Sequence, residues 1–537
     1  MATQRETFPI EFKGGLVSNL SPLQHGTQAI GSASILQNFE PSLTGGYAKL
    51  KGYAKFNSNK VEISSNSGGT NKIQGIAIVD TNTAIVARKD SAHANLVYYK
   101  VTTGSIDECH TVGSGDHAHG SRSTTPSASK VRSVVYNFNG TDKAVFVDGV
   151  NYPVFYNSGA ATASSVSFIT SASSGTPANV LAAKFVALFK DCLFFVVGTN
   201  LLSMQINNDT DFAGGTASIA NYEDEITGLL PFRDNLILFT RQAIFKITGT
   251  SNAFKSESIT TQIGCIEPDT VCEVGGDVLF MAPDGIRSLS ATDRIGDFGL
   301  DVASSPIKKD IDSFTSGDSF SAIVMREKGQ YRIFRYETGI QDEAAIGFLA
   351  TKFIAQGGQG LHWGKISGIH VFTADSRYMG QSGVSNELVL FGNDDGYIYM
   401  LESTDAFDGT AIHAIFESPP MPVNDPLIRK TFYKLILYID ANGAFESSIT
   451  LKYDDGSTDT IQPDPIELSS SGQATVLYGS SLFGATSSTY GVPLDVIYDN
   501  LVTGSGKTIK IRIEDTETLA NYRLDTALLE YASNDRQ

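Results

Sequence analysis

Cysteines and long apolar runs are scarce in this 537-residue chain, and each shortage excludes a class of protein. Four cysteines are too few for a disulfide framework, although Cys265 and Cys272 lie seven residues apart and could form one bond. The longest apolar runs span five or six residues, as in LFFVV, so we expect no membrane-spanning segment. The N-terminal MATQRETFPIEF has no charged region followed by an apolar one, so we expect no signal peptide.

Catalytic signatures are missing as well. We find no P-loop, no dinucleotide fingerprint, no G-x-S-x-G element and no cysteine with a partnered histidine. A propeller glycoside hydrolase would need two or three carboxylates at a central channel, and the many Asp and Glu residues leave that alternative open. We predict that the protein is not an enzyme and that it uses no cofactor.

Positive charge is in short supply, since the formal net charge is −18. A general nucleic-acid binder needs a surplus of Lys and Arg, so this class is disfavoured. The charge is unevenly spread: residues 1–60 hold six basic and three acidic side chains, whereas residues 441–537 hold six and fourteen. Opposite charge at the two ends of the chain suits contacts between copies or with a partner.

The middle of the chain repeats a pattern of three apolar strands separated by charged or glycine turns. Its clearest copies lie at 186–206, 228–248 and 269–290, and their turn aspartates, Asp191, Asp234 and Asp277, are 43 residues apart. Such a period indicates β-propeller blades. The alternative is a β-sandwich whose hairpins are merely similar.

Looser copies of the pattern flank these three. The second strand of each unit is expected to start near residues 83, 143, 192, 235, 278, 330 and 387. We therefore predict an all-β protein with a propeller of about six or seven blades over residues 67–405. After residue 405, period-2 alternation and Gly-, Asp- and Ser-rich turns predict a separate C-terminal β-sandwich over 406–537.

Two kinds of segment resemble metal sites. Residues 108–120 contain Glu108, Cys109, His110, Asp116, His117 and His119, but their spacing matches no zinc motif and the flanks are typical of a loop. The segments 207–212, 392–397 and 454–459 look like calcium loops but lack the full pattern, so we interpret them as β-turns. We predict no metal site.

A basic strand stands out near the N-terminus. If residues 47–56 form one strand, one face carries Tyr47, Lys49, Lys51, Tyr53 and Lys55. The other face is apolar and could pack on the body of the protein, which would point the basic face outwards. We interpret this face as a docking surface for another subunit or an adaptor; the alternative is a solvated edge strand.

Residues 12–56 resemble the N-terminal segment of the tail nozzle proteins of short-tailed bacteriophages, also called tail tubular protein B, and of related tail-hub proteins. The matching residues are Gly14, Gly15, Ser18, Pro22, Asn38, Gly46, Tyr47, Lys49, Lys51, Gly52 and Tyr53. The segments 425–440 and 521–537 resemble the closing sandwich of such proteins.

The resemblance implies a structural protein of the virion. Proteins of this kind form a ring, usually of six copies, below the portal and adaptor, around the channel through which DNA leaves. Tail fibres or spikes dock around the ring, and DNA passes without specific binding. The resemblance also makes residues 1–66 an N-terminal docking or platform segment, and it implies synthesis in a host cytoplasm. The alternatives are a non-enzymatic propeller adhesin that binds a receptor, or the propeller hydrolase.

Overall fold

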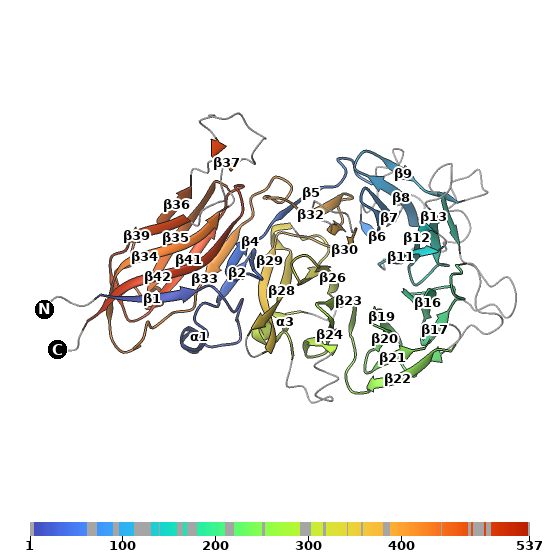
Figure 1. Ribbon diagram of the computed structural model, residues 1–537, viewed down its shortest axis with the longest axis horizontal. Coiled ribbons are helices and arrows are strands. Elements are labelled where there is room, and N and C mark those ends of the chain that lie inside the picture. The colour runs from blue at the N-terminus through green and yellow to red at the C-terminus, as the bar shows by residue number, and fades with distance from the viewer. Residues whose placement is uncertain are drawn as a thin grey trace.

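The computed structural model describes residues 5–61, 72–89, 96–111, 130–138, 140–157, 165–168, 180–209, 220–249, 253–289, 302–314, 318–340, 342–355, 358–379, 387–441, 443–470, 474–475, 488–489 and 496–534. Strands dominate, which confirms the predicted all-β class. They form two lobes side by side, a propeller and a β-sandwich, and both termini lie at the far end of the sandwich (Figure 1). In the described part, no helix is both long and apolar enough to cross a membrane.

The propeller consists of antiparallel strand groups around a central axis, with one strand of each group innermost. The innermost strands contact one another in a closed ring, in the order β6, β11, β15, β19, β23, β26, β30 and back to β6. Within the described residues, six of these groups are sheets of their own, and the group of β26 continues into a nine-stranded sheet. This confirms the prediction of six or seven blades.

The groups follow the ring in chain order. The first three are β6 (Ile73–Asp80), β7 (Thr83–Lys89), β8 (Leu96–Thr102), β9 (Ile106–Glu108); β11 (Arg132–Phe138), β12 (Thr141–Val147), β13 (Val154–Asn157), β14 (Ser165–Phe168), β10 (His110–Thr111); and β15 (Phe185–Phe189), β16 (Cys192–Val197), β17 (Asn200–Ser203), β18 (Ala220–Asn221). The next two are β19 (Ile226–Phe232), β20 (Asn235–Thr240), β21 (Ile244–Thr248), β22 (Lys255–Thr260); and β23 (Glu267–Val274), β24 (Asp277–Ala282), β25 (Gly285–Ser288). The last two are β26 (Ser319–Met325), β27 (Gln330–Tyr336), β28 (Ile346–Ala355), β29 (Gly358–Ser367); and β30 (Thr373–Tyr378), β31 (Glu387–Gly392), β32 (Ile398–Thr404), β5 (Gly52–Lys55).

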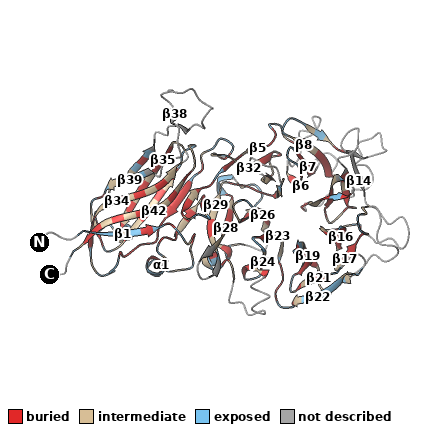
Figure 2. Cartoon of the chain, viewed as in Figure 1, coloured by how far each residue is buried: buried red, intermediate tan, exposed pale blue. Residues whose placement is uncertain are grey.

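The second strand of each group lies close to its predicted start. These strands are continuous apolar runs because neighbouring blades cover both of their faces, as the burial of β16 and β20 shows (Figure 2). Asp191 has the positive φ (58°) of a hairpin turn, as predicted. Asp277 does not lie in its turn: Gly275 (φ 55°) and Gly276 (φ 80°) form it, and Asp277 begins β24.

The sandwich has two sheets with the largest hydrophobic cluster between them. One contains β1 (Glu6–Glu11), β3 (Phe39–Pro41), β4 (Tyr47–Lys49), β34 (Lys430–Ala441), β39 (Val496–Leu501), β40 (Ser505–Gly506) and β42 (Tyr522–Ser533). The other continues from β29 through β2 (Ile35–Gln37), β33 (Ala414–Glu417), β41 (Ile509–Asp515), β35 (Phe445–Tyr453) and β36 (Ile466–Ser470). Period-2 burial along β41 places Ile509, Ile511 and Ile513 in the core.

Helices are few and short in the described chain: α1 (Pro22–Gln28) and α3 (Lys308–Ile311), with 3₁₀ turns at Ser305–Ile307, Asp342–Ala344 and Asp454–Gly456. A two-residue strand pair, β37 (Ala474–Thr475) and β38 (Ser488–Thr489), lies beside the sandwich (Figures 1 and 2).

The N-terminal segment is not a separate unit, so the boundary predicted at residue 66 is wrong. Strands β1 and β4 pair with β42, and β2 lies between β29 of the propeller and β33 of the sandwich. Strand β5 pairs with β32 and completes the last blade. The sandwich therefore needs both ends of the chain, and its N-terminal strands join the two lobes.

Candidate functional site

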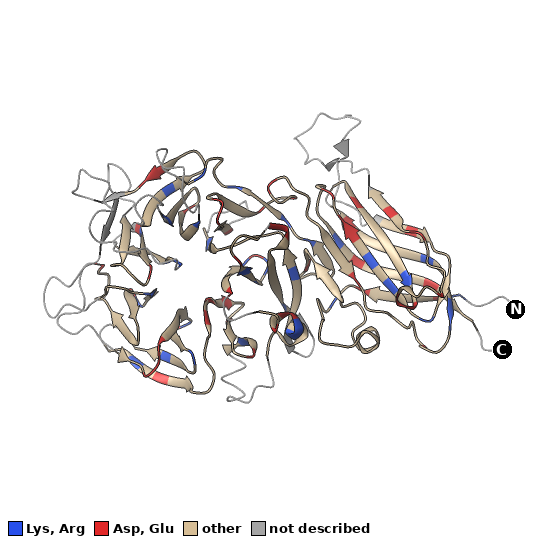
Figure 3. Ribbon diagram, turned by 180° about the vertical axis from the view of Figure 1, so that it is seen from behind, with Lys and Arg blue, Asp and Glu red and all other residues tan. Residues whose placement is uncertain are grey.

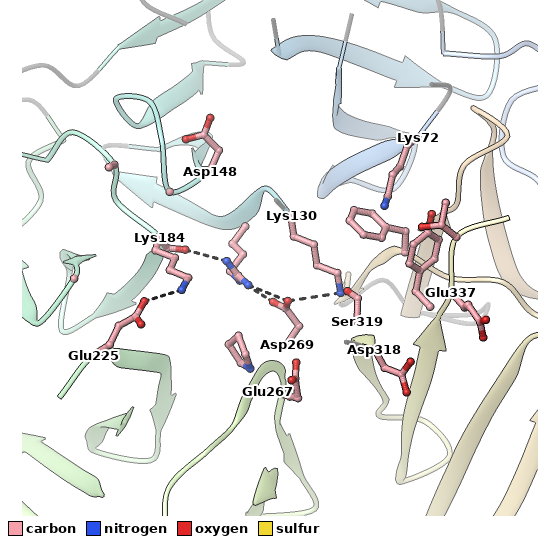
Figure 4. A pocket seen from close by; sticks show the side chains of 18 residues that line it. Lys72, Lys130, Asp148, Lys184, Glu225, Glu267, Asp269, Asp318, Ser319 and Glu337 are labelled. Atoms are coloured by element: carbon pink, nitrogen blue, oxygen red, sulfur yellow. Dashed lines mark hydrogen bonds and ion pairs between the residues drawn. The ribbon is translucent and has the colours of Figure 1, made fainter. Parts of the chain in front are cut away.

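A cavity of about 790 Å³ lies at the propeller axis, and we call it the axial cavity. Residues at or just before the first positions of the innermost strands line it, because those strands all begin at the same end of the axis. Acidic and basic positions surround the centre of the propeller (Figure 3). The charged lining residues are Lys72, Lys130, Arg132, Lys184, Asp148, Glu225, Glu267, Asp269, Asp318 and Glu337 (Figure 4).

The basic and the acidic lining residues occupy different sectors around the axial cavity. The first three innermost strands bring the basic residues, and the next three bring most of the acidic ones. Asp148 is the acid in the basic sector, and its carboxylate accepts hydrogen bonds from the backbone of Val150 and Asn151. The axial cavity is thus electrically polarised from one side to the other.

An ion cluster bridges the two sectors. Arg132 of β11 binds Asp269 of β23 through two contacts, Nε to Oδ1 at 2.7 Å and a terminal nitrogen to Oδ2 at 2.9 Å. Lys130 Nζ lies 3.6 Å from Asp269 Oδ2 and donates to the carbonyl of Phe320 on β26. These side chains connect non-adjacent innermost strands, so they close the propeller axis at this end.

The cluster determines the protonation of its members. Burial alone would raise the pKa of the Asp269 carboxyl, but the charges of Arg132 and Lys130 outweigh burial and hold that pKa below its ordinary value. Burial lowers the pKa of Lys130, against the opposing charge of Asp269. Asp269 is therefore a carboxylate whose oxygens are both engaged.

Two other lining residues are less completely compensated. The Lys72 ammonium lies over the rings of Phe372 (3.6 Å) and Tyr336 (4.2 Å), and burial lowers its pKa to about 8 although Asp394 opposes this. Burial, and then the charge of Asp269, raise the pKa of Glu267. Among the described residues, no ion pair or side-chain hydrogen bond satisfies either head group. Lys184, by contrast, pairs with Glu225 at 2.8 Å.

The chemistry of the lining depends on which of its polar groups are already engaged. A pair of catalytic carboxylates needs one oxygen free to act as base or nucleophile, and Arg132 and Lys130 engage both oxygens of Asp269. Lys72 and Glu267 instead present one donor group and one acceptor group to a ligand.

The basic docking face predicted at residues 47–55 is wrong for three of its five members. Tyr47, Lys49 and Tyr53 are only 0%, 1% and 6% exposed. The segment is not one strand, because the chain leaves the sandwich after β4 and enters the propeller at β5. Alternation therefore breaks at residues 50 and 51. Lys51 and Lys55 are exposed, and docking through them stays a prediction.

The buried members make structural contacts instead. Lys49 pairs with Asp515 at 2.9 Å, and neither side chain is exposed to solvent. Tyr53 stacks on Phe407 with ring centroids 5.2 Å apart. The exposed Lys55 also has a partner within the chain, since it pairs with Asp408 at 3.0 Å.

Residues that carry the family resemblance join the lobes. The Asn38 amide donates to the carbonyls of Ser367 (3.0 Å) and His413 (2.9 Å), one on the propeller side and one on the sandwich side. The Tyr47 hydroxyl donates to the Gly31 carbonyl at 2.8 Å and accepts from the backbone of Gly15 at 3.1 Å. Asn38 and Tyr47, which carry part of the family resemblance, therefore have structural roles in the fold.

A second buried ion cluster lies nearby. Arg332 contacts Glu40 at 3.0 Å and Glu402 at 2.6 Å, and Lys328 contacts the same two carboxylates at 2.6 Å each. Glu40 belongs to β3, Arg332 to β27 and Glu402 to β32, so the cluster joins the sandwich to two blades of the propeller. We call this cluster, together with Lys49 and Asp515, the N-terminal ion pairs.

The metal-like segment at 108–120 is described only to residue 111, and Asp116, His117 and His119 lie outside the described residues. Cys109 is buried, which raises the pKa of its thiol to about 12. Across the described ranges, no group of three or more His, Cys, Asp or Glu side chains could hold a metal. All four cysteines are free thiols, so Cys265 and Cys272 do not pair.

The turn interpretation is confirmed at residues 392–397. Asn393 Oδ1 accepts from the backbone of Asp395, and Asp395 Oδ1 accepts from the backbone of Tyr397. These are Asx turns, in which the side chain replaces a backbone partner.

The sequence reasoning missed the axial cavity, although a signal was present. A charged residue stands at or just before the start of successive innermost strands, as in Lys72, Lys184 and Glu225. The 43-residue step is clearest at the second strand of each unit. Aligning the units on their first strand instead shows that a charged residue recurs at its start.

The described strands form a propeller fused to a β-sandwich, with a charged cavity on the propeller axis. Residues 62–331 match the family described as Bacteriophage P22 Gp10, beta-propeller, and this span is half of the 537 residues. The chain belongs to this family and is a structural protein of a bacteriophage.

Similarity to solved structures is low. The chain is 11% identical to an exo-β-1,3-galactanase of Phanerochaete chrysosporium (TM-score 0.26, 90% of this chain and 100% of that chain). It is 8% identical to an arabinoxylan arabinofuranohydrolase of Bacillus subtilis (0.26, 90% and 99%). It is 9% identical to the extracellular domain of a hybrid two-component system of B. thetaiotaomicron (0.37, 74% and 45%), of which it thus spans under half. At these scores none bears on function, and no curated protein matches the chain.

Proposed function

We propose that this protein is a nozzle or hub component of a phage tail, present in the virion. Copies of it form a ring, expected to contain six, below the portal and adaptor, and tail fibres or spikes attach around that ring. Membership in the Bacteriophage P22 Gp10 propeller family supports this proposal. The fusion of the two lobes through β2 suits it too, because a ring subunit has to keep its shape under load.

The DNA channel of this ring would run between subunits. The axis of one propeller does not suit DNA, because Arg132 and Asp269 bridge it. The formal charge of −18 would repel phosphates along the shared wall, so that DNA passes without adhering.

Assembly of the purified full-length protein tests the proposal. Light scattering and negative-stain electron microscopy should show a closed ring, alone or after addition of the adaptor protein. A monomer under both conditions would overturn it. Reversal of the exposed Lys51 (K51E) should weaken the ring if this residue docks, whereas the exposed Lys255 on β22, changed to Glu, serves as the control.

We also propose that the protein has no hydrolytic activity, which the full engagement of Asp269 supports. Release of reducing sugar from host polysaccharide by the purified protein, lost in E267Q, would contradict this.

A further inference from the structure

The axial cavity leaves charge without a counter-ion, and such charge is costly. Lys72 and Glu267 both line the cavity, and neither has an ion-pair partner among the described residues. A half-buried charge loses hydration, and for Lys72 the attraction of the two aromatic rings and of Asp394 offsets this loss only in part. A ligand that supplies the missing partners recovers that free energy.

The lining specifies the chemistry of such a ligand. Lys72 calls for one negative group, whereas the carboxylates of Glu225, Asp269 and Glu337 disfavour a polyanion such as nucleic acid. Acceptor oxygens are abundant, since Glu267, Ser319 and Thr338 also line the cavity, so the ligand should carry several donors. Hydroxyl groups supply donors without adding charge.

The size of the cavity agrees with a small ligand. Its volume of about 790 Å³ lies in the range of about 300–1,000 Å³ that is usual for small-molecule sites. Phe372 and Tyr336 add an aromatic wall beside Lys72.

We propose that the axial cavity binds a carboxylate-bearing sugar, of the uronic acid class, whose carboxylate pairs with the Lys72 ammonium and whose hydroxyl groups hydrogen-bond to Glu267. The site does not depend on ring formation, so a failed assembly experiment leaves it standing, and the reverse also holds.

Titration calorimetry on the full-length protein tests this with three probes. Sodium glucuronate carries the carboxylate and the hydroxyls, glucose carries the hydroxyls alone, and β-alanine is a small zwitterion. Glucuronate should bind at least tenfold more tightly than either of the others. Equal binding of glucose would overturn the role of the carboxylate, and tighter binding of β-alanine would overturn the assignment to a sugar.

Variants place the ligand in the axial cavity. Lys72→Met should weaken glucuronate binding at least tenfold, and Glu267→Gln should weaken it by a smaller factor. Lys60→Met is the matched control, because the Lys60 ammonium also lies over an aromatic ring (Tyr397, 5.4 Å) but outside the cavity. Unchanged binding in a folded Lys72→Met variant would overturn the proposal, with the circular dichroism spectrum as the check of folding.

Chemical labelling gives a readout without added variants. Since the pKa of Lys72 is about 8, its neutral amine should react with acetic anhydride at pH 8 faster than that of Lys55, whose pKa is raised by its hydrogen bond to Asp408. Glucuronate should slow the labelling of Lys72 alone, measured by peptide mass spectrometry. Labelling of Lys72 that glucuronate leaves unchanged would count against the site.

Discussion

The N-terminal ion pairs and the charges of the axial cavity differ in their access to solvent. Lys49 pairs with Asp515 at 2.9 Å where neither side chain meets solvent. Arg132 and Asp269 are about one-fifth exposed, at 20% and 23%, and share their cavity with Lys72 and Glu267, which lack such partners. The pair of Lys49 and Asp515 thus joins strands away from solvent, whereas Lys72 and Glu267 face a cavity without an ion-pair partner in the described part of the chain.

The largest effect is expected at the N-terminal ion pairs. Lys49→Met leaves the Asp515 carboxylate buried and unpaired, so the free energy of unfolding should fall by about 3–5 kcal/mol. Urea denaturation followed by fluorescence measures this. The double variant Lys49→Met, Asp515→Leu should regain most of the loss, because two apolar side chains replace the pair. A Lys49→Met variant as stable as the parent would contradict the expected difference between the N-terminal ion pairs and the axial cavity.

A smaller loss is expected in the axial cavity. Arg132→Met removes the bidentate partner of Asp269, but Lys130 and water in the cavity still solvate the carboxylate. The free energy of unfolding should fall by about 1–2 kcal/mol in the same denaturation experiment. A loss equal to that of Lys49→Met would show that partial exposure does not distinguish the two clusters.

The stability of the protein is expected to depend on pH through His370, which lies beside the cavity. Burial alone would lower the pKa of His370, but Asp342 and Asp394, each 3.6 Å from Nδ1, outweigh burial and raise it. The resulting stabilisation is fully present below the pKa of an unfolded histidine, about 6.5, and is lost as the pH rises through the higher folded-state value.

Thermal denaturation between pH 5.5 and 8.5 measures how the contribution of His370 to stability changes with pH. The parent should lose stability relative to His370→Gln as the pH rises, whereas it should gain stability relative to His362→Gln, because burial lowers the pKa of His362. Parallel pH profiles of the parent and His370→Gln would contradict the assignment.

The smallest effect on folding is expected at Lys51, which is exposed. Lys51→Met should change the free energy of unfolding by less than about 0.5 kcal/mol. A loss comparable to that of Lys49→Met would mean that these two nearby lysines are equivalent, against the burial observed.

Local patterns predicted the propeller well because each blade is built from neighbouring segments. Strands β16, β20 and β24 follow one another at the detected step, and their partners lie within a few residues of them. Lys49 was misjudged because its partner, Asp515, is distant in sequence and no local pattern connects the two. The axial cavity was missed for a related reason, since it exists only once all the repeats converge.

The pairing of the first strand with the last affects the order in which the chain can fold during synthesis. Residue Glu6 lies opposite Tyr531, so β1 and β4 leave the ribosome long before β42 is made. The propeller blades can form as they emerge, whereas the edges of the N-terminal strands stay unpaired until β42 has been made. A chain that stops before residue 522 would lack β42 and expose those edges, so the sandwich is the lobe whose folding waits for the most distant part of the sequence.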